Sequence, residues 1–433
     1  MIDKYIITPF QKFVKVESLS GVLLFGATII ALIIANSSLA PAYESIWQYE
    51  FGIQSPDFKL VKPLILWIND GLMAVFFFLI GLEIKREVMI GELNSLRKAS
   101  FPFFAALGGM AIPITLYIIM NEDPATSHGW GIPAATDIAF SLAILQLLGS
   151  RVPISLKVFL AAFAIVDDIG AVLLIALFYS TGIKWLLLLI ALGIILILIL
   201  LSIRGIYNKY LYFAAGAVVW LLFLRAGFHP TVAGVLLAFT IPLRKKIDVK
   251  TYAVNLCDIV DEFKDAGDGK SPVLSKEQVD YIDDLEDWTS KVQSPLQHLE
   301  HSLHNWVAYL IIPVFAFANA GVNLTTGTDI DYRLILIIVL SLFAGKSIGI
   351  TLFTWLGRKF KLTVIPGNIK GSQLVGIAFL AGVGFTMSIF ISNLAFVDNP
   401  SVVNSAKIGI IAGSLISGLT GYLILRFSSK QKV

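Results

Sequence analysis

The residues best suited to chemistry are two adjacent aspartates, Asp167 and Asp168, in the apolar stretch FAIVDDIGAVLL (163–174). Charged side chains inside an apolar span are costly and mark an ion pathway or a proton relay. Two close carboxylates raise each other's proton affinity through repulsion and desolvation, which suits them to exchanging a proton for a cation near neutral pH. The alternative is a structural polar contact between helices. Because consecutive helix residues point about 100° apart, the two side chains cannot share one direction.

Asp137 follows a stretch that starts a helix poorly. Gly131, Pro133 and the Ala-Ala-Thr run after them predict a break near Thr136. A broken helix leaves carbonyl oxygens unpaired at membrane depth, where they are tolerated only against protein or a water-filled cavity. Carbonyl and carboxylate oxygens are hard ligands that suit alkali cations. The alternative is that Asp137 caps a helix near the membrane interface.

A second break is predicted in FLAGVGFTMSIF (379–390), at Gly382 and Gly384 just before Thr386. Paired interruptions in the two halves of a membrane protein indicate inverted repeats and a midplane binding site. Spans three to five and ten to twelve would form those halves. Glycines in membrane helices also serve close helix packing, which is the alternative reading.

Lys346, in LFAGKSIGI (342–350), is the counter-ion expected for the aspartates. Apolar residues extend on both sides of it, which disfavours the alternative that the side chain snorkels to an interface. A buried lysine also titrates, because desolvation lowers its pKa.

Further acids lie near the ends of apolar runs. Glu83, Arg86 and Glu87 in GLEIKREV (81–88) are three or four residues apart, so an ion-pair cluster on one helix face is expected. Such a cluster has either a structural or a functional role. Asp70 completes the set of acids inside apolar runs.

Three of the five histidines lie in HLEHSLH (298–304). A metal site is disfavoured because no cysteine is near and the histidines drift around a helix. A pH-responsive cluster with Glu300 is favoured, because histidine titrates in the physiological range. His229 stands alone in the sequence, and it is either a pH-responsive residue or a structural histidine.

The rest of the chain is suited to a membrane. Of 433 residues, 57% are hydrophobic and 15% charged, against about a quarter charged in soluble domains. The apolar runs are long enough to cross a bilayer as helices. The predicted fold class is therefore an all-α polytopic membrane protein with about twelve transmembrane helices and inverted repeats, in which spans four and eleven are discontinuous. The expected spans are 19–38, 63–84, 99–120, 129–148, 153–179, 183–202, 208–224, 229–243, 303–323, 333–356, 371–393 and 404–426.

Basic residues concentrate on alternate connections, such as 85–98 and 358–361, whereas 121–129 and 396–404 are poor in them. By the positive-inside rule, both termini are expected in the cytoplasm. The predicted regions are residues 1–243 with spans one to eight, 244–301 as a long acidic cytoplasmic loop, and 302–433 with spans nine to twelve.

Two connections differ from simple loops. Residues 41–62, with Gly52 and Pro56, predict an outside β-hairpin. The loop 244–301 is expected to be a mobile or partly helical appendage without a core of its own.

The chain resembles the NhaA family of bacterial sodium/proton antiporters, and the resemblance covers nearly all the spans in order. The matching stretches are WINDGLMAVFFFLIGLEIKRE (67–87), GWGIPAATDIAFSLAILQLLGSRVP (129–153), LKVFLAAFAIVDDIGAVLLIALFY (156–179), HPTVAGVLLAFTIPL (229–243), LEHSLHNWVAYLIIPVFAFANAGV (299–322), AGKSIGI (344–350) and GVGFTMSIF (382–390).

The resemblance implies roles for individual residues. Asp168 would bind the cation and exchange protons, while Asp167 would pair with Lys346 in one state. Asp137 and Thr136 would lie at the crossing of the broken helices, where the aspartate balances their N-terminal dipoles. The residues implied in pH response are Glu83, Arg86, Glu87, Glu300 and His301, and we group His229 with them.

Two features depart from the family pattern. Gln297 and His298 stand where a basic pair is expected, which puts the pH set-point in doubt, and the loop 244–301 is much longer than the family's usual connection. The family also implies a homodimer formed through the outside hairpin.

The predicted function is electrogenic, pH-regulated export of Na⁺ (or Li⁺) against H⁺ by alternating access, with Na⁺ held at Asp168 and Asp167. Such a protein is not an enzyme and needs no cofactor, contacts membrane lipid and no nucleic acid, and lies in the bacterial inner membrane. The alternatives are an intramembrane aspartyl protease, which needs its aspartates on two spans, and a cation channel without proton coupling.

Overall fold

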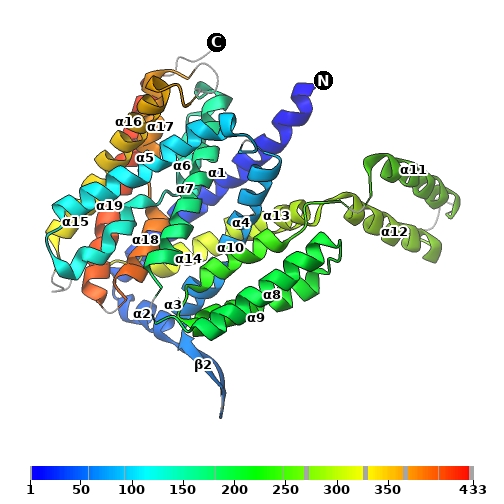
Figure 1. Cartoon of the computed structure of the whole chain (residues 1–433), viewed down its shortest axis with the longest axis horizontal. Coiled ribbons are helices and arrows are strands. Elements are labelled where there is room, and N and C mark those ends of the chain that lie inside the picture. The colour runs from blue at the N-terminus through cyan, green and yellow to red at the C-terminus, as the bar shows by residue number, and fades with distance from the viewer. Residues whose placement is uncertain are drawn as a thin grey trace.

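The computed structural model describes residues 2–428 except 57, 92, 181, 246, 268–272, 325–329, 364–368 and 398. The described part is almost entirely helical. Figure 1 shows a compact bundle from which a β-hairpin projects at one end and a pair of helices projects at one side. The helices of the bundle share four clusters of buried apolar side chains.

The first half of the chain contains ten α-helices, two strands and three irregular helical turns within the described residues. These are α1 (Ile2–Ala35), α2 (Ala40–Gln48), β1 (Glu50–Ser55), β2 (Phe58–Pro63), α3 (Leu64–Trp67), η1 (Ile68–Leu72), α4 (Met73–Met89), α5 (Leu96–Met120), η2 (Pro124–Ala134), α6 (Ile138–Leu147), η3 (Gly149–Arg151), α7 (Ile154–Phe178), α8 (Trp185–Ile203), α9 (Lys209–Ala226) and α10 (Pro230–Thr240).

The second half begins with the long connection and continues with the remaining helices. These are α11 (Val249–Asp265), α12 (Lys276–Val292), α13 (Pro295–Trp306), η4 (Val307–Ile311), α14 (Ile312–Asn319), α15 (Tyr332–Leu340), η5 (Ser341–Gly345), α16 (Lys346–Lys359), α17 (Gly371–Leu380), α18 (Phe385–Ala395) and α19 (Pro400–Ser428).

Seven helices in the described residues are long and apolar enough to cross a membrane, and the number rises to ten if three bent helix pairs each form one span. Two of these pairs, bent by 48° and 45°, lie where the sequence predicts discontinuous spans four and eleven. The predicted count of twelve is not reached on length and composition. One reason is that α10 has 11 residues, about 16 Å of helix, which is roughly half of a hydrocarbon core.

The outside connection differs in part from the prediction of a hairpin over 41–62. Its first half is the helix α2, and the strands of the hairpin are Glu50–Ser55 and Phe58–Pro63, with Glu50 opposite Pro63 and Ser55 opposite Phe58. The helix forms because it buries Tyr43, whose ring packs edge-on against Trp47 and Phe317.

The long connection after α10 is helical over most of its described length. Helices α11 and α12 pack on each other as a hairpin, joined by Tyr252 Oη and Thr289 Oγ1 at 3.0 Å. Only Ile259 among their described residues is a buried hydrophobic residue. Figure 1 shows this hairpin standing away from the bundle, which agrees with the expectation that the segment has no core of its own.

Close contact between α5 and α16 positions the lysine of the site. Gly108 and Gly349 face each other so closely that a Cβ on either one would lie 2.1–2.2 Å from the carbonyl oxygen of the other. The backbones can approach this far only without side chains at these two positions. Lys346 lies one helical turn before Gly349, so this contact sets the position of the lysine relative to α5.

We expect Gly349→Val to lower the melting temperature of the purified protein, because overpacking costs about 1–3 kcal/mol. Gly193→Val is the matched control, since nothing lies within 4 Å of a Cβ at that position of α8. Equal melting temperatures for the two variants in the same detergent would contradict the close-packing argument.

Candidate functional site

The site is built where two interrupted helices cross. One is η2 followed by α6, interrupted at residues 135–137, and the other is α17 followed by α18, interrupted at residues 381–384. In Figure 1, α6, α7 and α18 lie together within the bundle. At the two interruptions, backbone N–H and C=O groups without helical partners lie inside an apolar helix bundle.

The two interruptions satisfy each other's backbone groups. Thr136 Oγ1 donates to Ala381 O at 3.0 Å, and the backbone N–H of Asp137 donates to Val383 O at 2.7 Å. In the same way, Ser141 Oγ donates to Leu380 O at 2.8 Å. Since buried carbonyls without partners are costly, these bonds hold the two interruptions together.

A single carboxylate caps both helices that leave the crossing. Asp137 Oδ1 accepts the N–H of Phe140 in α6 at 3.0 Å. Its Oδ2 accepts the N–H of Thr386 in α18 at 3.0 Å and the hydroxyl of the same residue at 2.6 Å. A helix N-terminus carries a partial positive charge, so one anion faces two positive helix ends. Asp137 therefore acts as a helix cap, one of its two readings from the sequence; the other, a cation ligand, and the dipole role that the family resemblance implies stay predictions.

Asp167 and Lys346 form a fully buried ion pair beside the crossing. Lys346 Nζ lies 2.9 Å from Asp167 Oδ2, and their side chains are 0% and 1% exposed. The ammonium group also donates to the hydroxyl of Thr136. Asp167 Oδ1 has no hydrogen-bond partner among the described residues. The π-helical turn η5, of a kind that recurs at functional sites, directly precedes Lys346.

Asp168 lies on the same helix, α7, and is buried with 5% exposure. No described side chain or backbone group forms a hydrogen bond or ion pair with its carboxylate. An ionised carboxylate that is buried without a partner is strongly disfavoured. Asp168 is therefore the buried carboxylate whose charge no described group compensates, whereas Asp167 already has a partner. The two aspartates thus face different surroundings, as helix geometry requires.

The second group of predicted residues meets at the far end of α4. Arg86 Nε lies 2.9 Å from both carboxylate oxygens of Glu300, and another Arg86 nitrogen lies 2.7 Å from Glu87. Burial and the nearby Glu83 raise the pKa of Glu300 to about 7, although Arg86 opposes the shift. His304 Nδ1 lies 3.8 Å from Glu83 Oε1.

The structure separates two histidines from this cluster. His301 is exposed, whereas His304, one turn after Glu300, takes the position beside Glu83. His229 is the N-cap residue of α10, away from the cluster, and its Nδ1 lies 3.0 Å from Thr231 Oγ1. The sequence pattern HLEHSLH did not single out His304, although its spacing of four from Glu300 could have done so.

Other polar residues of the crossing carry no charge and were not selected from the sequence. Ser388 Oγ donates to Ile132 O at 2.8 Å, and Ser414 Oγ accepts the N–H of Gly384 at 3.2 Å. Serine and threonine are common in membrane helices, so only their contacts reveal that they complete the crossing.

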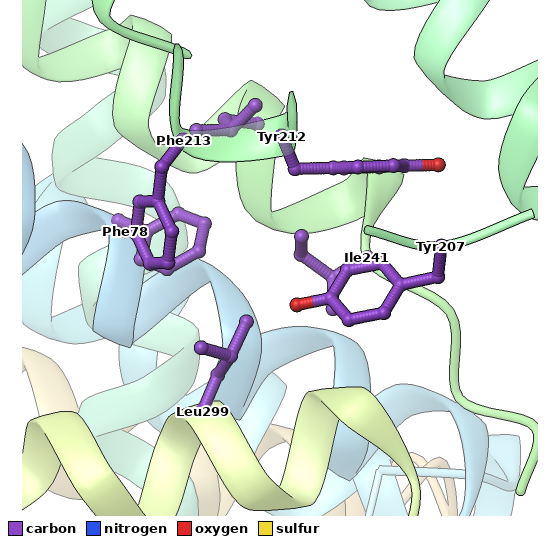
Figure 2. Close-up of a pocket in the computed structure, with 7 residues that line it drawn as sticks. Phe78, Tyr207, Tyr212, Phe213, Ile241 and Leu299 are labelled. Atoms are coloured by element: carbon purple, nitrogen blue, oxygen red, sulfur yellow. The ribbon is translucent and has the colours of Figure 1, made fainter. Parts of the chain in front are cut away.

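An apolar pocket lies elsewhere, between α4, α9, α10 and α13. Figure 2 shows Phe78 and Phe213 on one side of it and the rings of Tyr207 and Tyr212 on the other, with Leu299 from α13 between them. No carboxylate lines this pocket, so it is unsuited to a cation. No group of three or more His, Cys, Asp or Glu side chains in the described part of the chain is placed to hold a metal ion.

Apolar helices around a buried, charged helix crossing define an integral membrane protein with a charged site in its interior. The family model described as Na⁺/H⁺ antiporter 1 matches residues 11–425. The chain belongs to this family.

Curated relatives match over almost their whole length. The Na⁺/H⁺ antiporter NhaA of Bacteroides thetaiotaomicron is 46% identical over 97% of this chain and 98% of its own. The proteins of the same name from Oleidesulfovibrio alaskensis and Helicobacter pylori are 44% and 45% identical, over 98% and 97% of this chain and 95% and 96% of their own. A solved sodium/proton antiporter from Methanocaldococcus jannaschii covers 99% of both chains, with 14% identity and a TM-score of 0.47.

Removing one member of the buried ion pair tests its role in stability. We expect Lys346→Ala to lower the free energy of unfolding by about 3–5 kcal/mol, because Asp167 is left as a buried charge without a partner. The double variant Lys346→Ala/Asp167→Asn should recover most of the loss, since it removes the stranded charge. Thermal melts in detergent measure both, and a double variant no more stable than Lys346→Ala would contradict the pairing argument.

Proposed function

We propose that this protein exchanges Na⁺ (or Li⁺) for H⁺ across the membrane, with Asp168 as the group that takes either ion. The observation that carries the proposal is the buried carboxylate of Asp168, which has no described partner beside a neighbour that is already paired. The names of the relatives, Na⁺/H⁺ antiporters, support the same substrates.

The chemistry follows from competition for one carboxylate. A proton or a sodium ion neutralises Asp168, and only the neutral form is stable in an apolar interior. Asp167 supplies a second carboxylate, whose free Oδ1 adds a ligand oxygen when a cation binds. If cation binding to Asp167 breaks its contact with Lys346, the ammonium group of Lys346 releases a second proton, so two protons move for one Na⁺ and the exchange is proposed to be electrogenic.

Alternating access is proposed to use the crossing. Support comes from the two interruptions, whose backbone groups bond to each other across the crossing, since transporters with inverted repeats build midplane sites from such broken helices. Spans three to five and ten to twelve are proposed as the repeats within twelve spans, with both termini in the cytoplasm of a bacterial cell and the chain in its inner membrane.

A homodimer is proposed through the outside hairpin. Every residue of β1 is exposed, including Phe51 and Ile53 at 62% and 69%. A two-stranded sheet with exposed apolar residues and free edges is a template for pairing with a second copy.

Purified protein in proteoliposomes with an internal pH dye tests the function. We expect a sodium gradient to drive proton movement, and Asp168→Asn to reduce it by at least about a hundredfold, because the amide can neither carry a proton nor balance a cation. Asp258→Asn, on the projecting helix α11, is the control and should exchange normally.

The same assay separates the alternatives. Sodium uptake without proton movement in the unaltered protein would indicate a channel and overturn the proposal. Full exchange by Asp168→Asn would leave antiport standing but remove Asp168 from its centre.

The Glu83, Arg86, Glu87, Glu300 and His304 cluster is proposed to couple transport to pH. The pKa of Glu300 is about 7 in the folded protein, above its ordinary value of 4.5. Between these pH values the folded protein retains a proton that the unfolded chain has lost, so stability falls as pH rises through this window and is constant above it.

We expect Glu300→Gln to remove this fall in melting temperature between about pH 4.5 and 7, and to weaken the change in exchange rate near pH 7. Glu286→Gln, on the exposed surface of α12, is the matched control. An unchanged pH profile of both melting temperature and exchange in Glu300→Gln would exclude Glu300 as the responding group.

A further inference from the structure

Three asparagines from three separate elements meet in the interior of the bundle. Asn319, the last residue of α14, exchanges two hydrogen bonds with Asn69 of η1, of 2.8 and 3.3 Å. Asn393, in the last turn of α18, donates to Asn319 Oδ1 at 2.7 Å. Asn69 and Asn319 are buried, with 7% and 1% exposure.

The hydrogen bonds of this cluster identify it as a connection and not as an ion site. Asn319 Oδ1 accepts from two amides, and its Nδ2 donates to Asn69 and to the carbonyl of Phe315. The oxygens of Asn319 and Asn69 are therefore already used by amide donors. A cation at Asn319 Oδ1 would have to displace one of its two donors, whereas a contact between elements needs both.

The cluster lies on the β-hairpin side of the crossing. Helix α18 begins at Phe385 beside the crossing and reaches Asn393 eight residues later, about 12 Å away. Asn69 lies shortly after β2 and α3, which lead from the hairpin into the bundle. The asparagines are thus between the proposed ion site and the outer end of the protein.

Along α18, Phe390 lies between the crossing and the asparagine cluster, and we call Phe390 with its ring neighbours the aromatic plug. Phe390 of α18 is fully buried, and its ring centroid lies 5.8 Å from Phe77 of α4, 6.2 Å from Phe315 of α14 and 5.6 Å from His229. These neighbours belong to elements that hold none of the residues proposed to bind the ion. Helix α18 therefore presents one face to the crossing and another to a separate group of helices.

We propose that Asn69, Asn319 and Asn393 form a latch that keeps the hairpin side of the ion site closed. The inference rests on the proposed alternating access, which requires this side to open in part of the cycle. Opening requires α18 to move away from α14 and η1, and this breaks the Asn393–Asn319 bond together with the Phe390 contacts.

Amides suit such a latch because water can replace their partners. A buried amide without a partner is costly, but opening this side admits water that satisfies the released groups. The latch therefore favours the closed form modestly, whereas an ion pair at this place would resist opening much more strongly.

Two matched reporters on α10 test the latch. Thr231 and Thr240 are each 1% exposed and lie at opposite ends of this helix, with Thr231 bonded to His229 on the side of the plug. Each is replaced by cysteine in a Cys257→Ser background, which removes the chain's one cysteine. The rate of reaction with N-ethylmaleimide is then measured in detergent, where both sides are accessible.

Asn393→Ala is the test variant and Ser392→Ala its control, because among the described residues the Ser392 hydroxyl bonds only to Ile389 O, within α18 itself. We expect Asn393→Ala to raise labelling of Thr231→Cys roughly threefold over the control, in line with typical hydrogen bonds between membrane helices. Labelling of Thr240→Cys should not rise.

Equal labelling of Thr231→Cys in both variants would overturn the latch, and so would a rise at both reporters, which indicates general loosening. The Cys257→Ser parent is also assayed for sodium-driven proton movement. Its failure to exchange would count against the proposed function, whereas normal exchange with unchanged labelling would count against the latch alone.

Discussion

The constraint on which this structure depends is that backbone polar groups inside an apolar bundle need partners. Two helices are interrupted in the middle of the bundle, and each interruption supplies what the other lacks. Thr136, Ser141 and the N–H of Asp137 donate to the carbonyls of Ala381, Leu380 and Val383. Asp137 also caps the helix that follows each break. Neither interruption is stable alone at membrane depth, so the crossing forms as a unit or not at all.

The charges of the site follow from this arrangement. Once Asp137 is committed to two helix ends, Lys346 has Asp167 and Thr136 as its partners, and Asp168 is left without one. A buried carboxylate in that position is unstable unless it binds a proton or a cation. The cluster around Glu300 is separate from the helix crossing, because the ion pairs of Arg86 with Glu87 and Glu300 hold it at the far end of α4.

Much of the site could be read from residue types, because charges and helix breakers are rare in apolar runs and each one needs a reason. The break near Thr136, the break at Gly382 and Gly384, and the special position of Asp167 and Asp168 all follow from that argument. The residues that complete the crossing could not be read in this way. Ser388, Ser414 and Thr386 are ordinary in membrane helices, and His304 differs from His301 only in the direction it faces.

The sequence by itself determined the membrane class, the family, the two interruptions and the short list of buried charges, because these are properties of composition and local order. Tertiary structure decided which charge meets which. Helix periodicity shows that Asp167 and Asp168 diverge, but only the packing of α5 against both α16 and α7, with Gly108 and Gly349 in close approach between α5 and α16, places Lys346 beside Asp167. It also decided that Asn69, Asn319 and Asn393 meet, since contacts between residues hundreds of positions apart depend on how helices pack and not on the pattern within any one of them.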